Sequence, residues 1–333
     1  MTSERIRALD GLRALAVALV FIHHAFPTYF PGGFIGVDIF FVISGFVITS
    51  ALMRDGIDFR RFYIHRFFRI IPPVVPVLLF VLTAYMFDIA LASPTDVASS
   101  AFSLMNWMRA FEVSSGDYLG HFWSLAIEEQ FYLLWPGLLA LLLGVRTRPA
   151  SIVVTLLIMS LAVQVALFVS GASVERIYNG LDSRASQLLM GCLLFFVLDR
   201  VQVPSLIAVS ALSALLACAL LIEPYSAFYL TAGIGLVGAL SAVMIANMAQ
   251  GTALWQWPFL LPIAQWGGSR SYAIYLWHFP LLGLFKLAGW PNATGAVAAG
   301  AATCLAAEVS MRLVERPARA MRDRFTSADR VAA

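Results

Sequence analysis

The feature that most constrains this chain is a series of long apolar runs, which recur from near its N-terminus to near its C-terminus. A run of about 20 apolar residues is needed for a helix to cross a hydrocarbon core of about 30 Å. Of the 333 residues, 60% are hydrophobic and 12% are charged, and soluble domains have about twice that charged share. A water-soluble fold could not bury so much apolar surface. We therefore predict an all-α fold, a polytopic membrane bundle of about ten transmembrane helices.

The predicted spans follow these runs. They lie at about 8–27, 34–53, 70–90, 121–144, 151–170, 186–198, 203–222, 227–249, 271–289 and 295–313. The sixth span is short unless residues 182–187 are helical too. The further apolar segments 99–111 and 252–266 are expected to lie along the membrane interface or to re-enter the membrane. Residues 1–320 are predicted to form a single transmembrane domain, and residues 321–333 a cytoplasmic tail.

Arginine residues predict the orientation of the bundle, because positive charges beside a span are retained on the cytoplasmic side. The loop after the second span and the C-terminal tail both contain many arginines, and with ten spans both fall on one side. The opposite loops contain mainly Asp and Glu. The N- and C-termini are therefore predicted to be cytoplasmic. The net charge of +3 reflects this sidedness and gives no indication of nucleic-acid binding.

Function is expected to depend on polar residues inside the spans, since ionisable groups are costly there. In the first span, Arg13 and His24 are far enough apart to lie near opposite ends. At about 100° per residue they share one helix face to within about 20°, separated by roughly 16 Å along the axis. His23 points elsewhere. Snorkelling of both side chains to the interfaces is the structural alternative.

Asp38 enters the second span shortly after Gly32 and Gly33, at about the depth of His24. A carboxylate beside an imidazole fixes the tautomer of the imidazole and raises its basicity, so His24 could then act as a general base. An ion pair or helix cap that merely joins two helices is the alternative for Asp38.

The fourth span begins with a polar face. His121, Ser124 and Glu128 follow at helical spacing, and Glu129 lies on a neighbouring face. Two adjacent carboxyl groups at a membrane edge suggest a proton donor or acceptor. Ser124 is also of a type that packs and hydrogen-bonds between membrane helices.

The ninth span also has a polar face, because Ser271, Tyr275 and His278 follow one another at helical spacing. His278 is then expected near the middle of the membrane. Glu308, in the last span, precedes Arg312 by one helical turn and is interpreted as a local ion-pair partner.

A basic stretch interleaved with aromatic residues, residues 60–72, precedes the third span. Such a patch is typical of an anionic-lipid anchor. Its residues Arg61, Arg66 and Arg69 also suit a phosphate-bearing cofactor, because guanidinium groups bind phosphate through paired hydrogen bonds.

These segments together resemble acyltransferase family 3, a family of bacterial membrane O-acyltransferases. The resemblance rests on ordered motifs along nearly the whole chain: Arg13 with His24, GGFIGVDIFFVISGF (32–46), RFFRIIP (66–72), HFWSLAIEEQFYLLWP (121–136), SYAIYLWHFP (271–280) and VERPAR (314–319). Because the chain stops at residue 333, it looks like the stand-alone form without an SGNH-type domain.

The resemblance implies a ten-helix enzyme in the bacterial cytoplasmic membrane that transfers an acyl group, usually acetyl, from cytoplasmic acyl-CoA to a hydroxyl of an extracytoplasmic or lipid-linked glycan. Arg61, Arg66 and Arg69 are expected to hold the coenzyme phosphates, with Arg13 lining the path. No metal is predicted.

Within that hypothesis, His24 acts as a general base on the acceptor hydroxyl or as a transient acyl carrier, oriented by Asp38 or Glu128. Ser124, Tyr275 and His278 are expected to shape the pocket or hold the acceptor.

Two other classes of protein remain as alternatives. A transporter or flippase of a glycan or anionic solute would also have about ten spans and intramembrane ionisable groups. A metal enzyme could be assembled from His24, Asp38, Glu128 and His278, although no single segment has metal-ligand spacing.

Overall fold

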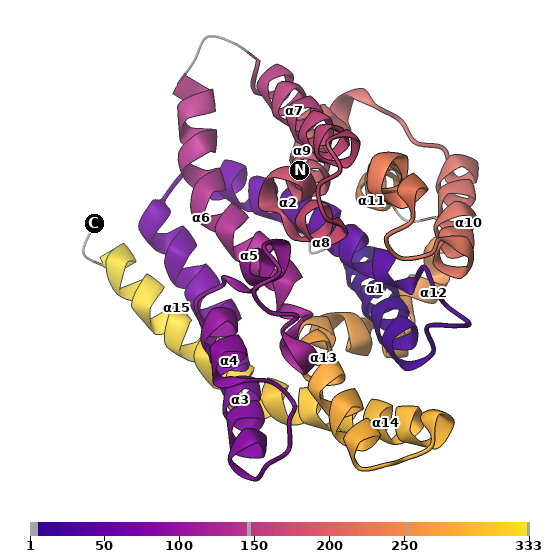
Figure 1. Cartoon of the computed structure of the whole chain (residues 1–333). Coiled ribbons are helices and arrows are strands. Elements are labelled where there is room, and N and C mark those ends of the chain that lie inside the picture. The colour runs from indigo at the N-terminus through magenta and orange to yellow at the C-terminus, as the bar shows by residue number, and fades with distance from the viewer. Residues whose placement is uncertain (1–5, 145–147, 252, 332–333) are drawn as a thin grey trace.

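The computed structural model describes residues 6–144, 148–251 and 253–331, and every regular element within these ranges is a helix. Figure 1 shows the long helices gathered into a bundle, with α15 crossing beside α3. The long helices are α1 (Arg7–Ala25), α2 (Gly36–Asp55), α3 (Phe59–Met86), α6 (Phe122–Gly144), α7 (Pro149–Val169), α9 (Leu181–Val197), α10 (Ser205–Leu221), α11 (Ile234–Gln250), α13 (Pro262–Leu287), α14 (Asn292–Ser310) and α15 (Arg316–Val331). Short helices connect them: α4 (Pro94–Ala101), α5 (Met105–Ala110), α8 (Val174–Asn179) and α12 (Trp257–Leu260).

The predicted fold class is confirmed. Eight helical segments in the described residues are long and apolar enough to cross a membrane, and they coincide with eight of the ten predicted spans. The seventh predicted span, 203–222, forms α10, which is apolar but has only 17 residues. The ninth, 271–289, forms the later part of the 26-residue helix α13, which is not among the eight. The number of spans and the side on which the termini lie remain predictions.

Two helices begin earlier than the sequence predicts. Helix α3 starts at Phe59 instead of residue 70, and the Asp58 carboxylate caps it by accepting a hydrogen bond from the Arg61 amide at 2.9 Å. Helix α9 starts at Leu181, so residues 182–187, which the sequence left open, are helical and lengthen the sixth span. Both additional stretches are polar, and a polar stretch ends an apolar run without ending a helix. The longer α3 brings the arginines at 66 and 69 onto a regular helix.

The C-terminal helix also continues further than expected, because residues 321–331, predicted as a tail, extend α15. The connection from α14 is a π-helical turn, Met311–Glu315. Pro317 follows it and has no N–H to donate to the carbonyl of Leu313, and a local widening of the helix is a common response to such a lost bond. This turn places Glu315 on the inner side, with 7% of its surface exposed.

The segment between α3 and α6 packs into the protein. Met105 and Asn106 in α5 are fully buried, and Gln130 in α6 donates a hydrogen bond to the Asn106 side chain at 2.9 Å. Arg109 forms an ion pair with Glu175 of α8 at 3.1 Å. The predicted stretch 99–111 is therefore held against α6 and α8. The other ambiguous stretch, 252–266, contains a short 3₁₀ turn, α12 and the start of α13, with residue 252 outside the described residues.

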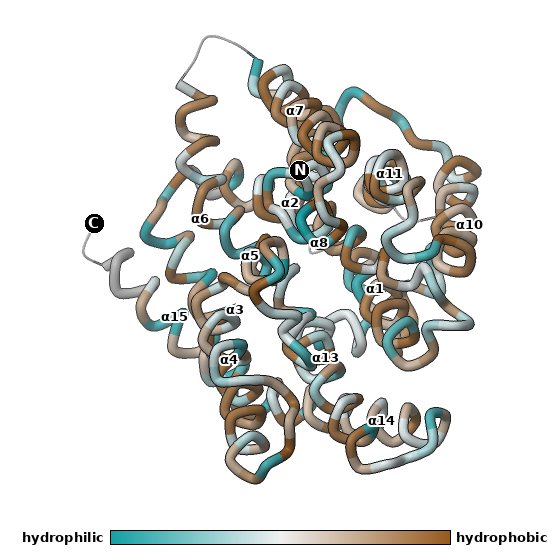
Figure 2. The backbone as a smooth tube through the Cα atoms, in the orientation of Figure 1, coloured by the Kyte–Doolittle hydropathy of each residue, from teal (hydrophilic) through white to brown (hydrophobic). Residues whose placement is uncertain are grey.

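The outer surface of the bundle is apolar, which fits a chain surrounded by lipid. Figure 2 shows hydrophobic residues over most of α7 and α10. Large side chains on these helices, among them Ile158, Met159 and Leu206, are exposed. Apolar surface on this scale is expected of a protein that faces hydrocarbon and not water. The chain is accordingly a multi-pass membrane protein.

Small residues let the inner helices approach closely. Helices α2 and α9 cross at Gly45 and Gly191, and a Cβ atom at either position would overlap a backbone carbonyl oxygen of the other helix, that of Leu188 or Val42 respectively. Close backbone approach at small residues is the usual basis of helix association in membranes, where lipid and protein are equally apolar. This crossing fixes α2 beside the polar part of α9.

Replacing Gly45 with alanine is expected to destabilise the bundle by about 1–3 kcal/mol, because the backbone on both sides of the contact is rigid. The thermal midpoint of the purified protein in detergent measures the effect. Gly137 in α6 is a matched control, since a Cβ there meets nothing within 4 Å. Gly137→Ala should leave the midpoint unchanged or raise it slightly. Equal midpoints for Gly45→Ala and wild type would contradict the close contact.

Candidate active site

A cavity lined by charged, polar and aromatic side chains lies inside the bundle and contains about 740 Å³ of space that no protein atom fills. Helices α1, α2, α3, α6 and α13 all contribute to its wall, so segments from both halves of the chain meet there. It is lined by Arg13, Val37, Phe40, Phe41, Ser44, Arg66, Arg69, Ile70, Ser124, Leu125, Glu128, Glu129, Tyr132, Ser271, Tyr272 and Tyr275. Six of the predicted site residues therefore line one cavity: Arg13, Arg66, Arg69, Ser124, Glu128 and Tyr275.

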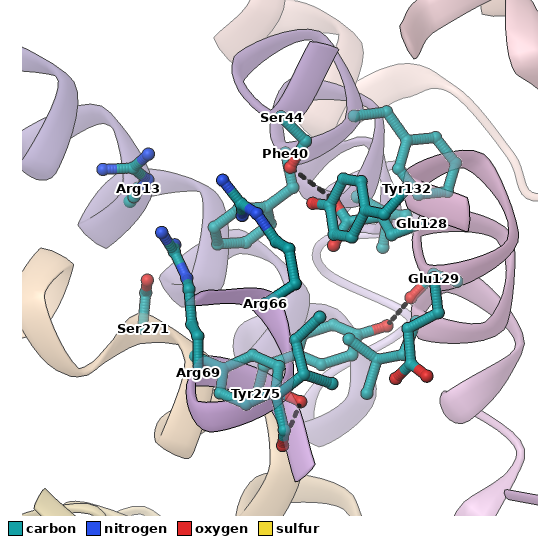
Figure 3. A pocket seen from close by; sticks show the side chains of 16 residues that line it. Arg13, Phe40, Ser44, Arg66, Arg69, Glu128, Glu129, Tyr132, Ser271 and Tyr275 are labelled. Carbon is teal, nitrogen blue, oxygen red and sulfur yellow. Dashed lines mark hydrogen bonds between the residues drawn. The ribbon is translucent and has the colours of Figure 1, made fainter. Parts of the chain in front are cut away.

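Arginine side chains dominate one side of this cavity. Figure 3 shows Arg13, Arg66 and Arg69 opposite Glu128 and Tyr132. The Arg13 guanidinium forms an ion pair with Asp10, one helical turn earlier, at 3.0 Å. The Arg66 guanidinium lies over the Tyr132 ring, 5.1 Å from its centroid. These contacts hold the cationic side of the cavity in place.

Two carboxyl groups lie on the opposite side. The Ser44 hydroxyl donates a hydrogen bond to the Glu128 carboxyl group at 2.5 Å, which joins α2 to α6. Glu129 accepts a hydrogen bond from Ser103, in the segment that packs against α6. Because adjacent residues on a helix point in different directions, Glu128 and Glu129 receive these bonds from different elements. The cavity therefore has carboxyl groups and guanidinium groups on facing walls.

A second cavity, of about 1750 Å³, adjoins the first and shares Arg13, Arg69, Ser271 and Tyr272 with it. Its remaining charged lining is mainly arginine: Arg54, Arg270, Arg316, Arg319 and Arg322, with Asp10 and Glu315 as the carboxylates. Guanidinium groups in such numbers attract polyanions, above all phosphates. The π-helical turn before α15 brings the C-terminal arginines to this place.

Tyr275 closes the other end of the first cavity. Its hydroxyl lies 2.6 Å from the Ser124 hydroxyl and donates to the His121 carbonyl at 3.0 Å. Its own backbone carbonyl accepts a hydrogen bond from His278 Nδ1 at 2.5 Å. Tyr275 thus lines the cavity and is hydrogen-bonded to His278, which lines neither cavity.

His278 belongs to a cluster of three imidazoles, with His24 of α1 and His121 at the start of α6. His24 Nδ1 lies 2.9 Å from His278 Nε2. His121 Nε2 donates to the Leu276 carbonyl at 3.2 Å. That carbonyl lacks its helical partner because Pro280 has no N–H. The proline of the HFP sequence therefore frees the acceptor that orients His121.

The structure departs from the sequence predictions at Asp38 and Arg61. Asp38 does not contact His24, because its carboxylate accepts hydrogen bonds from Arg184 at 2.5 Å and Tyr229 at 2.6 Å. It is fully buried between these partners. Arg61 lies in the first turn of α3 and lines neither cavity. Glu128 bonds to Ser44 and not to His24.

The sequence reading missed Arg184, the partner of Asp38. Arg184 falls in the stretch 182–187, whose helical state the sequence left open, and it was not considered as a site residue, although an arginine in an apolar helix is itself a signal of a buried pair. Ser44 and Tyr132 were also missed. Tyr132 lies one helical turn after Glu128, and that spacing could have indicated it, whereas Ser44 lies on a different face of its helix from Asp38 and had no such signal.

Comparison with known proteins agrees with this architecture. The sequence model described as an acyltransferase domain matches residues 6–311. Peptidoglycan O-acetyltransferase OatA of Listeria monocytogenes is 35% identical over 94% of this chain and 56% of its own length. Putative peptidoglycan O-acetyltransferase YrhL of Bacillus subtilis is 34% identical over 94% of this chain and 55% of its own length. O-acetyltransferase OatA of Staphylococcus aureus is 32% identical over 93% of this chain and 57% of its own length.

The fold and its two adjoining cavities define a helical membrane protein with charged side chains gathered inside the bundle. More particularly, the chain belongs to acyltransferase family 3, as its match over residues 6–311 shows. It spans a little more than half the length of the curated relatives that it matches. No solved structure matches it.

Proposed function

We propose that this chain is a membrane O-acyltransferase that takes an acyl group, acetyl in the first instance, from acyl-CoA and delivers it to a hydroxyl of a glycan. The observation that carries the proposal is the pair of adjoining cavities, one rich in arginine and the other lined by Tyr275, whose backbone carbonyl accepts a hydrogen bond from His278. The relatives named as peptidoglycan O-acetyltransferases support a glycan acceptor and an acetyl group.

The arginine-rich cavity suits the donor. Coenzyme A carries phosphates at one end and a thioester at the other, separated by an extended chain. We propose that Arg69, Arg316 and Arg319 hold the phosphates. The pantetheine arm then enters the first cavity beside Arg66, so the thioester reaches the wall formed by Ser124 and Tyr275. This arrangement supports a cytoplasmic position for the arginine-rich end, in the bacterial inner membrane.

His24 suits the chemical step. In the proposed reaction its Nε2 atom takes the proton from the acceptor hydroxyl while the hydroxyl oxygen attacks the thioester carbonyl. The new C–O ester bond forms as the C–S bond breaks, and the departing thiolate of coenzyme A recovers the proton. A transient acyl group on His24 is the second route, in which the imidazole attacks the thioester first. Both routes release one free thiol for each acyl group transferred.

Release of that thiol tests the proposal. The purified chain in proteoliposomes is supplied with acetyl-CoA and a peptidoglycan-derived oligosaccharide, and both free coenzyme A and acetylated sugar are measured. We expect the two products in equal amounts, and only when both substrates are present. Movement of the oligosaccharide across the bilayer without thiol release would instead indicate a transporter.

Arg66→Gln and Arg69→Gln are each expected to raise the KM for acetyl-CoA roughly tenfold, since a lost charged hydrogen bond costs about 1.5–3 kcal/mol. The KM for the sugar should change much less. Arg61→Gln is the matched control, because Arg61 lies on the same helix but lines neither cavity. If Arg61→Gln raised the KM for acetyl-CoA as much as Arg69→Gln does, the donor would be attracted by positive charge in general and not bound at Arg66 and Arg69.

A further inference from the structure

The three clustered imidazoles offer an inference about how His24 is prepared for its role. His24 and His278 are stacked, with ring centroids 5.1 Å apart, and His121 lies 5.1 Å from His278 by the same measure. His278 is fully buried, and His121 is 3% exposed. Phe279 packs against the His24 ring at 4.4 Å and limits its rotation. The geometry therefore fixes which nitrogen atoms face one another.

The backbone determines the position of the proton on His278. Its Nδ1 atom lies 2.5 Å from the Tyr275 carbonyl oxygen. A carbonyl oxygen only accepts hydrogen bonds, so Nδ1 of His278 must carry a hydrogen. In a neutral imidazole the other nitrogen then has a lone pair and accepts. Nε2 of His278 is consequently an acceptor.

The neutral state follows from the surroundings. No ion pair joins His24, His121 or His278 to a carboxylate in the ranges that the structure describes. A buried charge without a partner is costly, so these imidazoles are neutral. Since His278 Nε2 accepts, the facing His24 Nδ1, 2.9 Å away, must donate. His24 is left with a lone pair on Nε2, which is the atom that a general base uses.

We propose that His278 is a positioning residue that holds His24 in the Nδ1–H tautomer through a relay from the Tyr275 carbonyl. The proposal rests on the proposed function only where it assigns the Nε2 lone pair of His24 to proton removal. It replaces the expectation that His278 holds the acceptor, since both of its ring nitrogens are occupied by protein groups. His121 serves as an internal reference, because its bond to Leu276 fixes the opposite tautomer, Nε2–H.

Nitrogen NMR of the full chain, labelled with ¹⁵N-histidine in lipid nanodiscs, tests the relay without any assay of activity. In the wild type we expect the proton of His24 on Nδ1 and that of His121 on Nε2, with signals assigned by single His→Gln variants. In His278→Leu, His24 should move largely to the Nε2–H tautomer, because its acceptor is gone. His278→Gln retains an acceptor oxygen near the position of Nε2 and should preserve Nδ1–H. A proton on Nε2 of His24 in the wild type overturns the proposal.

Kinetics give the second readout. His278→Leu is expected to lower kcat on the order of 100-fold. The KM values for acetyl-CoA and for the sugar should stay within about twofold of wild type. His278→Gln should recover most of the lost kcat. An increase in the KM for sugar with unchanged kcat would show that His278 binds the acceptor and would overturn the positioning role.

The two proposals fail in different ways. If His278→Leu moves the proton on His24 but transfer continues at the wild-type rate, the relay stands and the role of His24 as base fails. If the wild type shows the wrong tautomer while acyl transfer proceeds, the relay fails and the acyltransferase function stands. The wild-type spectrum alone decides the relay, so a variant that does not fold leaves the test intact.

Discussion

Replacement of His24 with alanine is expected to lower acyl transfer by on the order of 100- to 10,000-fold, because the reaction would lose the group that we propose removes the proton from the acceptor hydroxyl. In the proposed relay, His278 accepts from His24 Nδ1 and leaves the Nε2 lone pair of His24 available as the base. Formation of acetylated oligosaccharide in proteoliposomes measures the loss. The thermal midpoint of the variant should remain within a few degrees of wild type, so inactivity reflects chemistry and not unfolding.

His23 provides the matched control. It has the same side chain in the same helix and the same Nδ1–H tautomer, because its Nδ1 atom donates to the Phe30 carbonyl oxygen 3.0 Å away, but that bond joins it to the loop after α1 and not to His278. His23→Ala should retain transfer within about threefold of wild type, a loss too small for a general base. Normal transfer by His24→Ala to the true acceptor would remove His24 from the mechanism. Strong loss in both variants would indicate that the outer end of α1 is needed as a whole.

The sequence predicted the fold class well because burial in a membrane leaves a simple pattern. Apolar runs located eight of the helices that could span a membrane, and errors occurred where helices are polar. Residues 59–69 and 181–185 are helical but face arginine cavities or buried partners, and hydropathy alone cannot separate such helices from loops. Helices α10 and α13 also lie at predicted places. Neither is among the eight segments that are long and apolar enough to cross a membrane, and α10 has only 17 residues.

The candidate site was predictable to the extent that it lies along single helices. Arg66 and Arg69 share a cavity because one turn of α3 separates them, and Ser124 lies one turn from Glu128 for the same reason. Contacts between helices could not be inferred in this way. Asp38 and His24 were placed at equal depth, yet α2 turns Asp38 towards Arg184. Equal depth does not specify direction, and direction depends on how α2 and α9 pack.

Removal of Asp38 is expected to destabilise the protein by about 3–5 kcal/mol, because an unpaired arginine would remain in the interior. Asp38 and Arg184 are both fully buried and 2.5 Å apart. Gln187 also donates to Asp38, at 3.0 Å. The rings of Phe41, Trp123, Tyr178 and Tyr229 surround the Arg184 guanidinium, and Tyr178 is the nearest, 4.9 Å from ring centroid to Cζ. The pair therefore joins helices α2 and α9 to several others.

Asp38→Ala and Arg184→Met should each lower the thermal midpoint in detergent strongly, whereas the double variant Asp38→Leu/Arg184→Met should lose less than either single variant, since no charge is left unpaired. Asp182→Ala is the matched control. Asp182 also pairs with an arginine, Arg176, but its side chain is 41% exposed. The Asp182→Ala variant should therefore lose about 1 kcal/mol or less of the free energy of unfolding. Additive losses in the double variant would contradict a coupled buried pair.

The double variant also decides what Asp38 does. Because Asp38 bonds to Arg184 and Tyr229 and not to His24, a folded Asp38→Leu/Arg184→Met protein should retain acyl transfer within about tenfold of wild type, well short of the loss expected when a general base is removed. Transfer and thermal midpoint are measured on the same preparation. Loss of transfer as large as that of His24→Ala, at a midpoint near wild type, would restore Asp38 to the reaction itself and show that its distance from His24 in this structure changes during turnover.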